Sequence, residues 1–197
     1  MKIISLFLCF ISFSISFAQC DYSSISLNNS TKSLFIKSYP ITVDMYETPF
    51  NGRLILATLI RNGDIYYIDF EITRDSSAQD LEPHCFERGD RVSFSLSDNS
   101  IISLTQTEER ICGIKLEDKN QEFITVTDYI RVIVTQDAYE KLSKHEIILM
   151  KITGKEFNKT IVLKSELEES SENEVQITNP TRFFMDNIDC MVNPQFD

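Results

Sequence analysis

Apolar and polar residues alternate with a period of two along much of this chain. The clearest case is the stretch from His84 to Gly113, where three apolar residues share one face of the first arm: Val92, Phe94 and Leu96. A period of two is typical of a half-buried β-strand, and Asp98-Asn99-Ser100 supplies residues that favour a turn. We therefore predict a β-hairpin in this stretch.

The register of this hairpin decides where its cysteines lie. A three-residue loop centred on Asn99 pairs Leu96 with Ile102 and keeps apolar partners on one face. The cysteines are one residue off this register, and a bulge at Gly89-Asp90 would bring Cys85 opposite Cys112. The alternative is that the arms diverge earlier and that the two cysteines pair elsewhere.

A second hairpin is predicted between Leu54 and Thr73. Its turn is Asn62-Gly63, the strongest short signal for a tight hairpin. Pairing about these two residues places Leu59 opposite Tyr66 and makes one face of the hairpin wholly apolar. This pattern fits an antiparallel sheet with one face in a core.

The remaining periodic segments complete a mainly β fold. We expect further strands at 33–36, 41–46, 123–127, 129–135, 147–153, 160–167, 175–178 and 183–190. Residues 137–144 show a helical pattern instead, in which Asp137 can cap a short helix and Glu140 completes a capping box. Many short strands with one helix predict an antiparallel β-sandwich or barrel built from hairpins, and an α+β arrangement is the alternative.

The first eighteen residues have the composition of a secretory signal peptide. Lys2 precedes an apolar run, and Ser16 and Ala18 leave small residues where a signal peptidase cuts. We expect residues 1–18 to be removed and residues 19–197 to form a single β-rich domain that is secreted or periplasmic. An uncleaved anchor and an outer-membrane lipoprotein modified at Cys20 are the alternatives, but the residue before Cys20 is glutamine rather than a small one.

Four cysteines remain once Cys9 is removed with the signal, because the sequence contains five. An even number in an exported chain indicates two disulfides. If Cys85 bonds Cys112, then Cys20 is left with Cys190, which would join the two ends of the mature chain.

The chain is strongly acidic, with a formal net charge of −11. Nucleic acids and anionic membranes attract basic surfaces, so we expect neither as a partner. No segment of the mature chain is apolar for long enough to predict a transmembrane helix. The acidic segment Glu166–Glu174 is interpreted as an exposed loop or a frayed strand end. A calcium site there is the alternative, although the segment lacks the alternating Asp/Asn ligands and the glycine of a calcium loop.

The motifs of the common hydrolases are absent from the sequence. It contains neither Gly-x-Ser-x-Gly nor His-Glu-x-x-His, and we expect no metal site and no cofactor. His84 adjoins Cys85, but a half-cystine is a better interpretation of Cys85 than a nucleophile. Asp69 and Glu71 share one face of a strand, as paired catalytic carboxylates would, and as charged residues on a solvated face also do.

The sequence is similar to small, uncharacterised exported proteins of Bacteroidota-type bacteria. The similarity is carried by the signal ending Ser-Phe-Ala-Gln, and by Cys85-Phe86, Asp90–Phe94, Asp98, Cys112-Gly113 and Tyr139–Lys151. It implies export and a β-rich fold. It implies no activity and no site residues.

These observations favour a non-enzymatic exported β-domain that binds a macromolecule or has a structural role in the cell envelope. The expected partner is a protein or another envelope component. The alternative is a secreted hydrolase that uses acidic residues near Asp69 and Glu71. A cleft that holds both carboxylates with another acid opposite would favour the hydrolase.

Overall fold

The computed structural model describes residues 22–28, 32–77, 80–117, 124–170 and 175–194. The strands of its large sheet are β1 (Tyr22–Asn28), β2 (Ser33–Ser38), β3 (Ile41–Glu47), β4 (Asn51–Asn62), β5 (Ile65–Ser76), β7 (Arg91–Leu96), β8 (Ile101–Gln106), β10 (Ile114–Glu117), β11 (Ile124–Val134), β12 (Ile147–Thr153) and β13 (Asn158–Val162). Two small sheets pair β6 (Cys85–Glu87) with β9 (Arg110–Cys112), and β14 (Leu167–Ser170) with β15 (Val175–Thr178).

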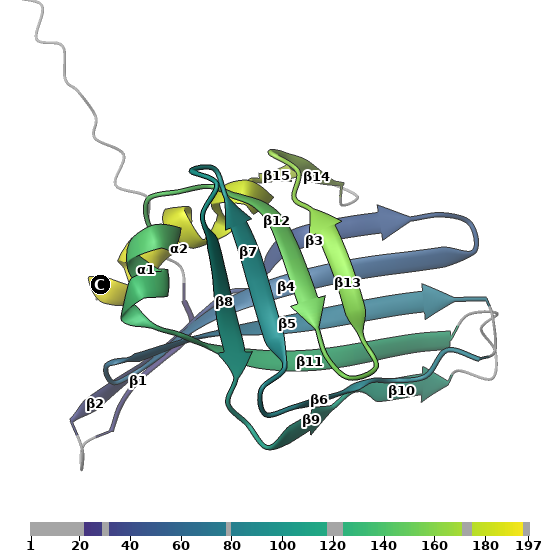
Figure 1. Cartoon of the computed structure of the whole chain (residues 1–197), viewed down its shortest axis with the longest axis horizontal. Helices are drawn as coiled ribbons and strands as arrows, with labels where there is room; N and C mark the ends of the chain where they lie inside the picture. The colour runs from purple at the N-terminus through teal and green to yellow at the C-terminus, as the bar shows by residue number, and fades with distance from the viewer. Residues whose placement is uncertain (1–21, 29–31, 78–79, 118–123, 171–174, 195–197) are drawn as a thin grey trace, which may run out of the picture.

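The large sheet folds over on itself to give two layers. Its strands follow the order β1-β2-β4-β5-β11-β8-β7-β12-β13, with β3 also on β4 and β10 also on β11. In Figure 1, β7, β8, β12 and β13 form a front layer that crosses the longer strands β4, β5 and β11 behind it. The layers join where β8 pairs with β11 over only two residue pairs. The described sheet is a sandwich and does not close into a barrel, so the predicted mainly β sandwich is confirmed and the α+β alternative is not.

The core lies between the two layers and is centred on three phenylalanines. Phe70 comes from the back layer, Phe94 from the front layer and Phe183 from a C-terminal helix, and their ring centroids are 6.3 to 6.4 Å apart. All three side chains are buried. Buried aromatic rings of this size contribute much of the apolar area in a core, so this cluster ties both layers to the helix.

The predicted hairpins are present, with both registers shifted by two residues. In the β4–β5 hairpin the turn residues are Gly63 and Asp64, so Leu59 lies opposite Ile68 rather than Tyr66. Gly63 alone takes a positive φ, of 62°, and its amide donates a hydrogen bond to the Leu34 carbonyl. A shift of two leaves every side chain on its predicted face, because the side-chain period of a strand is two.

The central hairpin has the predicted three-residue loop, one position earlier than expected. Phe94 pairs with Ile102, and Asn99 takes the left-handed φ of 65° that such loops need at their third residue. Farther out, Cys85 lies opposite Cys112 and the two form the predicted disulfide. Gly89 has a φ of 98°, but the extra residue that absorbs the offset lies on the opposite arm, between β8 and β9.

The first helix begins one residue before its predicted start. Helix α1 spans Gln136–Leu142, and its N-cap is Thr135, whose hydroxyl accepts a hydrogen bond from the Ala138 amide. The prediction that Asp137 is the cap is therefore wrong. Asp137 lies in the first turn, where its charge is favourable to the helix dipole.

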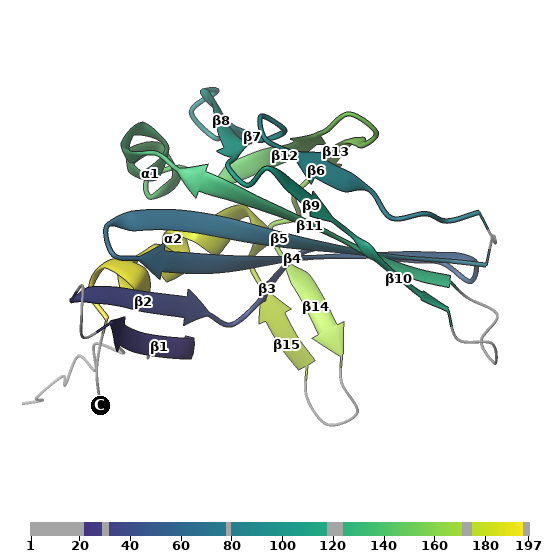
Figure 2. The ribbon, with the colours of Figure 1, turned by 90° about the horizontal axis from the view of Figure 1, so that it is seen from below.

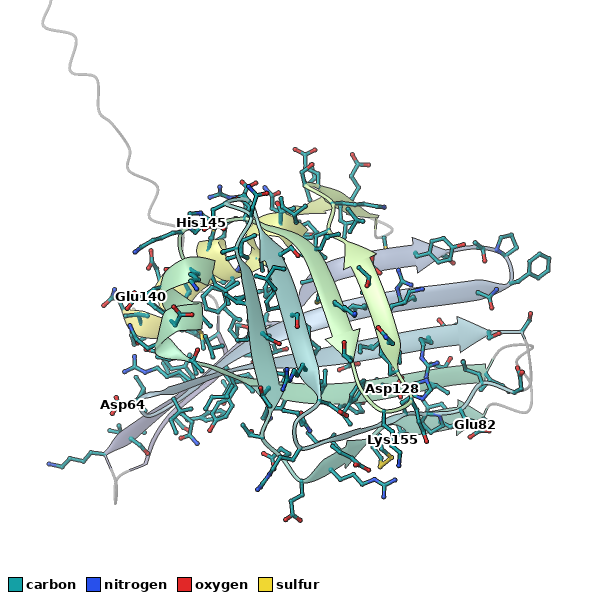
Figure 3. The ribbon with its side chains drawn as sticks, in the orientation of Figure 1. Asp64, Glu82, Asp128, Glu140, His145 and Lys155 are labelled. Atoms are coloured by element: carbon teal, nitrogen blue, oxygen red, sulfur yellow. A yellow bond between two sulfur atoms is a disulfide. The ribbon has the colours of Figure 1, made fainter. Side chains whose placement is uncertain are left out.

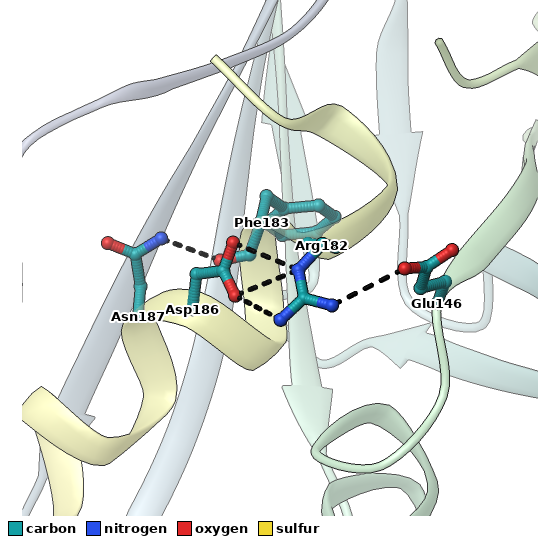
Figure 4. Close-up of polar contacts among 5 residues, drawn as sticks. All are labelled: Glu146, Arg182, Phe183, Asp186 and Asn187. Carbon is teal, nitrogen blue, oxygen red and sulfur yellow. Dashed lines mark hydrogen bonds and ion pairs between the residues drawn. The ribbon is translucent and has the colours of Figure 1, made fainter. Parts of the chain in front are cut away.

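The predicted strand at 183–190 is a helix. A 3-10 turn, η1 (Pro180–Arg182), leads into α2 (Phe183–Val192), which buries Phe184, Ile188 and Met191. Arg182 bonds both Asp186 in the helix and Glu146 just before β12, and so ties the start of α2 to the front layer (Figure 4). In the described residues, no helix is long and apolar enough to cross a membrane.

A buried carboxylate holds the disulfide end of the central hairpin against the back layer. Asp128 of β11 is fully buried and accepts hydrogen bonds from Arg74 of β5 and from the backbone amide of His84. Gly113 packs so closely on Asp128 that a Cβ atom there would collide with its carboxylate. Figure 3 shows Asp128 at the same end of the sandwich as Glu82 and Lys155.

Candidate functional site

The outer face of the back layer carries a row of polar cross-strand pairs between β5 and β11. The four pairs, which we call the polar ladder, are Asp69 with Arg131, Glu71 with Tyr129, Thr73 with Thr127, and Asp75 with Thr125. Each strand contributes alternate residues, so all eight side chains share the face opposite the core. The ladder is about 20 Å long at the rise of ~3.4 Å per residue of an antiparallel strand.

An ion pair forms one end of the ladder. The two carboxylate oxygens of Asp69 accept hydrogen bonds from Nε and Nη2 of Arg131, each at 2.6 Å. The hydrogen bond to Asp69 raises the pKa of Arg131 against the opposing effect of burial, so the guanidinium stays charged. This two-pronged geometry fixes the orientation of both side chains.

The next pair joins a carboxylate and a phenol. Burial raises the pKa of Tyr129 above its ordinary value, and the charge of the neighbouring Glu71 raises it further. Tyr129 is therefore a neutral hydroxyl at physiological pH and can both donate and accept. Among the described residues, the carboxylate of Glu71 has no hydrogen bond or ion pair, so it is open to a ligand.

The other two pairs of the ladder are joined by hydrogen bonds that involve threonine hydroxyls. The Oγ1 atoms of Thr73 and Thr127 are 3.2 Å apart, and Oγ1 of Thr125 donates to Asp75 at 2.6 Å. These bonds hold the far half of the ladder in a single arrangement.

Two hollows lie on this face, one at each end of the ladder. The first, of about 360 Å³, holds Asp69, Glu71, Tyr129 and Arg131, together with Glu108, Lys37 and Thr58 from other strands and loops. The second, of about 500 Å³, lies beside Asp75 and Thr125 near the turn that joins β3 and β4. The surface is thus hollowed at both ends of the ladder.

Apolar side chains flank the ladder on the side of β10. Strand β10 pairs with β11, and Ile114 and Leu116 lie opposite Thr127 and Thr125. Both are large apolar residues that remain about half exposed. In Figure 2, β10 lies beside one end of β11. The polar ladder therefore has an apolar border available to a ligand.

The structure brings Asp69 and Glu71 into one hollow with a third acid. Glu108, from the loop between β8 and β9, lines the hollow and lies 3.9 Å from Nη1 of Arg131. Glu108 is thus a further acid beside Asp69 and Glu71, which is the arrangement that the hydrolase alternative requires. The sequence alone could not link four other residues to this hollow, because they come from separate segments that only the strand order brings together. They are Lys37, Glu108, Tyr129 and Arg131.

The other candidate residues lie away from the ladder. Cys85 is bonded to Cys112, which rules it out as a nucleophile paired with His84, and the ring of His84 packs on Phe157. Among the described residues, no group of three His, Cys, Asp or Glu side chains is placed to hold a metal. Of the acidic segment Glu166–Glu174, the part up to Ser170 forms or borders β14, and 171–174 fall outside the described residues.

The second predicted disulfide involves a residue outside the described range. Cys190 in α2 is disulfide-bonded, but Cys20 is not described, so its pairing with Cys190 stays a prediction. Tyr22, two residues after Cys20, donates a hydrogen bond from its hydroxyl to the Cys190 carbonyl at 3.0 Å. This contact brings the start of β1 to α2, as the predicted bond requires.

A comparison with models of protein families, with curated proteins and with solved structures finds no match for this chain.

Proposed function

We propose that this chain is an exported, non-enzymatic β-sandwich domain that binds a glycan of the cell envelope along the polar ladder. The observation that carries the proposal is the ladder itself, a row of fixed polar pairs hollowed at both ends. A surface of about this length fits an extended chain better than a compact small molecule. The signal sequence and the Cys85–Cys112 disulfide support export, because disulfides persist in oxidising compartments.

The chemistry of the first hollow favours a ligand rich in hydroxyl groups. Lys37 donates, Glu71 accepts, and Tyr129 and Thr58 can do both. A sugar hydroxyl is also both donor and acceptor, so a glycan can satisfy such a mixed lining without carrying a net charge. Tyr129 and the exposed Ile114 and Leu116 offer apolar surface for the faces of sugar rings.

The state of Asp69 favours binding over hydrolysis. A glycoside hydrolase needs two carboxylic groups that are free to exchange protons with the substrate and with water. Both oxygens of Asp69 are engaged by Arg131, so this carboxylate acts as a fixed acceptor rather than as a general base. It also holds the Arg131 guanidinium in position for a ligand.

Hydrolysis is the second candidate because three acids line one hollow. Asp69 and Glu71 could act as a pair, with Glu108 beside them, if the ion pair between Asp69 and Arg131 opened when substrate binds. The two candidates differ in one measurable respect, which is the release of new reducing ends.

The test uses the mature chain, residues 19–197, on an array of envelope glycans and soluble polysaccharides. We expect retention of at least one glycan, with affinity reduced about tenfold or more by Glu71→Gln, because a charge-assisted hydrogen bond is lost. Glu140→Gln, which changes an exposed acid on α1 that lines neither hollow, is the matched control (Figure 3).

The same samples are then assayed for reducing ends. Binding without product supports the proposal. Product formation that Asp69→Asn abolishes at unchanged stability would establish the hydrolase instead. Equal glycan affinity of Glu71→Gln and the wild type would show that the polar ladder takes part in neither function.

A further inference from the structure

A third hollow is lined by residues of β3, β4 and β5 in the back layer and of β13 in the front layer. These strands meet at the end of the sandwich away from α1 and α2 (Figure 1). The hollow has a volume of about 340 Å³ and we call it the mouth cavity. Three basic side chains line it: Arg53 of β4, Arg74 of β5 and Lys159 of β13. In a chain with a net charge of −11, a cavity with three cations from both layers stands apart from the surface as a whole.

The two arginines lie directly opposite each other in the β4–β5 pairing. Like charges in that position repel, so each must be held by another group. Asp44 holds Arg53 through Nε at 2.7 Å, and Asp128 holds Arg74 through Nε and Nη2. The arginines are thereby fixed in place with spare donors. Among the described residues, neither terminal nitrogen of Arg53 nor Nη1 of Arg74 has a hydrogen-bond partner.

Lys159 adds the third cation from the opposite layer. It is exposed and forms no ion pair with any described residue. The acid in the lining, Asp75, already accepts a hydrogen bond from Thr125. Asp44 and Asp128 offset the charges of the two arginines, and Asp75 carries one negative charge in the same lining. Lys159 therefore adds an ammonium group with no ion-pair partner among the described residues, rather than a net positive charge.

The walls of the mouth cavity are apolar. The ring of Tyr46 lies 5.9 Å from the guanidinium carbon of Arg53, and the ring of Phe157 lies 5.9 Å from that of Arg74. Leu81 completes this lining. The Nε–Nη2 edge of Arg74 is occupied by Asp128, so the donors that can reach a carboxylate beside these rings are Nη1 of Arg74 and the terminal nitrogens of Arg53.

We propose that the mouth cavity binds a carboxylate carried on an apolar body. The carboxylate lies between the arginines and Lys159, and the apolar body packs on Tyr46, Phe157 and Leu81. A free organic acid and the C-terminal carboxylate of a peptide ending in an apolar residue share this chemistry. The mouth cavity borders the second hollow and shares Asp75 with the polar ladder, but it has no lining residue in common with the first hollow.

The test is a titration of the mature protein with 3-phenylpropanoate, followed by calorimetry and NMR. We expect saturable binding of the acid and at least tenfold weaker binding of its neutral amide. Lys159→Gln should weaken binding of the acid about tenfold, because one charge-assisted contact is removed. Lys151→Gln, an exposed lysine on the neighbouring strand β12 outside the cavity, should bind as the wild type does.

A second variant keeps the test valid if Lys159→Gln disturbs the fold. Arg53→Lys keeps a charge beside Asp44 but loses the planar fork, and should weaken binding several-fold at unchanged thermal stability. Acetylated tripeptides ending in Phe, with a free or amidated C-terminus, show whether a peptide end enters the cavity as well as the free acid.

Three outcomes would overturn the proposal. They are equal affinity for the acid and the amide, no binding of either the acid or the free-ended peptide, and equal behaviour of Lys159→Gln and Lys151→Gln. Binding of inorganic phosphate alone would also overturn it, since phosphate has no apolar body.

Discussion

Strands β5 and β11 carry two Arg–Asp pairs, one on each face of the back layer. On the inner face, Arg74 of β5 bonds Asp128 of β11 at 2.7 Å, while on the outer face Asp69 of β5 bonds Arg131 of β11 at 2.6 Å. The side chain of Asp128 is 0% exposed and that of Asp69 is 29% exposed. The same two residue types therefore meet across the same two strands in different surroundings.

The difference in burial assigns the two pairs different roles. A buried carboxylate must have its hydrogen bonds satisfied, and Asp128 meets this need with Arg74 and the His84 amide. Those contacts fix the end of the central hairpin, so the inner pair serves the fold. The outer pair is partly solvated and contributes little to stability, so its value lies in presenting an ordered polar surface.

The largest expected effect comes from removing the inner carboxylate charge. Asp128→Asn should lower the free energy of unfolding by about 3–5 kcal/mol, because Arg74 is left without its counter-charge in a buried site. Urea unfolding measures this change. Asp137→Asn, an exposed acid on α1, is the control and should stay within about 0.5 kcal/mol of the wild type. A loss below about 1 kcal/mol for Asp128→Asn would contradict the structural role of the inner pair.

The disulfide beside the inner pair should have the next largest effect. Cys85 and Cys112 are 27 residues apart, and the chain-entropy model gives about 3–4 kcal/mol for closing a loop of that length. The double variant Cys85→Ser/Cys112→Ser should lose a large part of this stability in the same assay. Unchanged stability would show that Asp128 alone holds this end of the hairpin.

Breaking the outer pair should affect binding more than folding. Asp69→Asn should change the free energy of unfolding by no more than about 1 kcal/mol, because the pair is partly exposed. Glycan binding should fall about tenfold, since Arg131 loses the partner that orients it. Thermal unfolding and array binding of the same sample separate the two effects. A loss of stability equal to that of Asp128→Asn would contradict the distinction between the inner and the outer Arg–Asp pair.

The smallest expected effect is on the pKa of Tyr129, and it tests whether Glu71 lies beside this residue on the outer face. Glu71→Gln should lower the pKa of Tyr129 but leave it above the ordinary value near 10, because burial is the larger cause and remains. The raised folded-state pKa means that the neutral phenol stabilises the fold fully below about pH 10, and that this contribution is lost as the pH rises through the folded pKa. NMR titration of the tyrosines measures the shift. An unchanged pKa of Tyr129 would show that the charge of Glu71 does not act on this residue.

The sequence was enough to predict the faces of the hairpins but not their exact registers. Alternation places Leu59 and Phe70 on the core face whatever the turn, whereas the register depends on which residues take the turn conformation. Gly63, rather than Asn62, has the positive φ, and that choice shifts every pair by two. In the central hairpin, the pairing of Cys85 with Cys112 was predicted correctly although the β7–β8 register was not, because an extra residue between β8 and β9 offsets the cysteines from that register.

The segment 183–190 was predicted to be a strand, but it belongs to helix α2. Phe184, Ile188 and Met191 nevertheless follow a spacing of four and three, which is the signal of a helix face that could have identified it. Only the β5 half of the polar ladder could be predicted from the sequence. The period of β5 gives Asp69 and Glu71 a common face, but their partners on β11 follow from a pairing between segments more than fifty residues apart in sequence.

The central claim is that the inner Arg–Asp pair maintains the fold and the outer pair builds the binding face. Double-mutant cycles on both pairs test it most directly, with Arg74→Met and Asp128→Asn for the inner pair, and Arg131→Met and Asp69→Asn for the outer pair. The account predicts a coupling energy of about 2–3 kcal/mol for the inner pair and below about 1 kcal/mol for the outer pair. Equal coupling energies, or a larger one for Asp69 and Arg131, would contradict it.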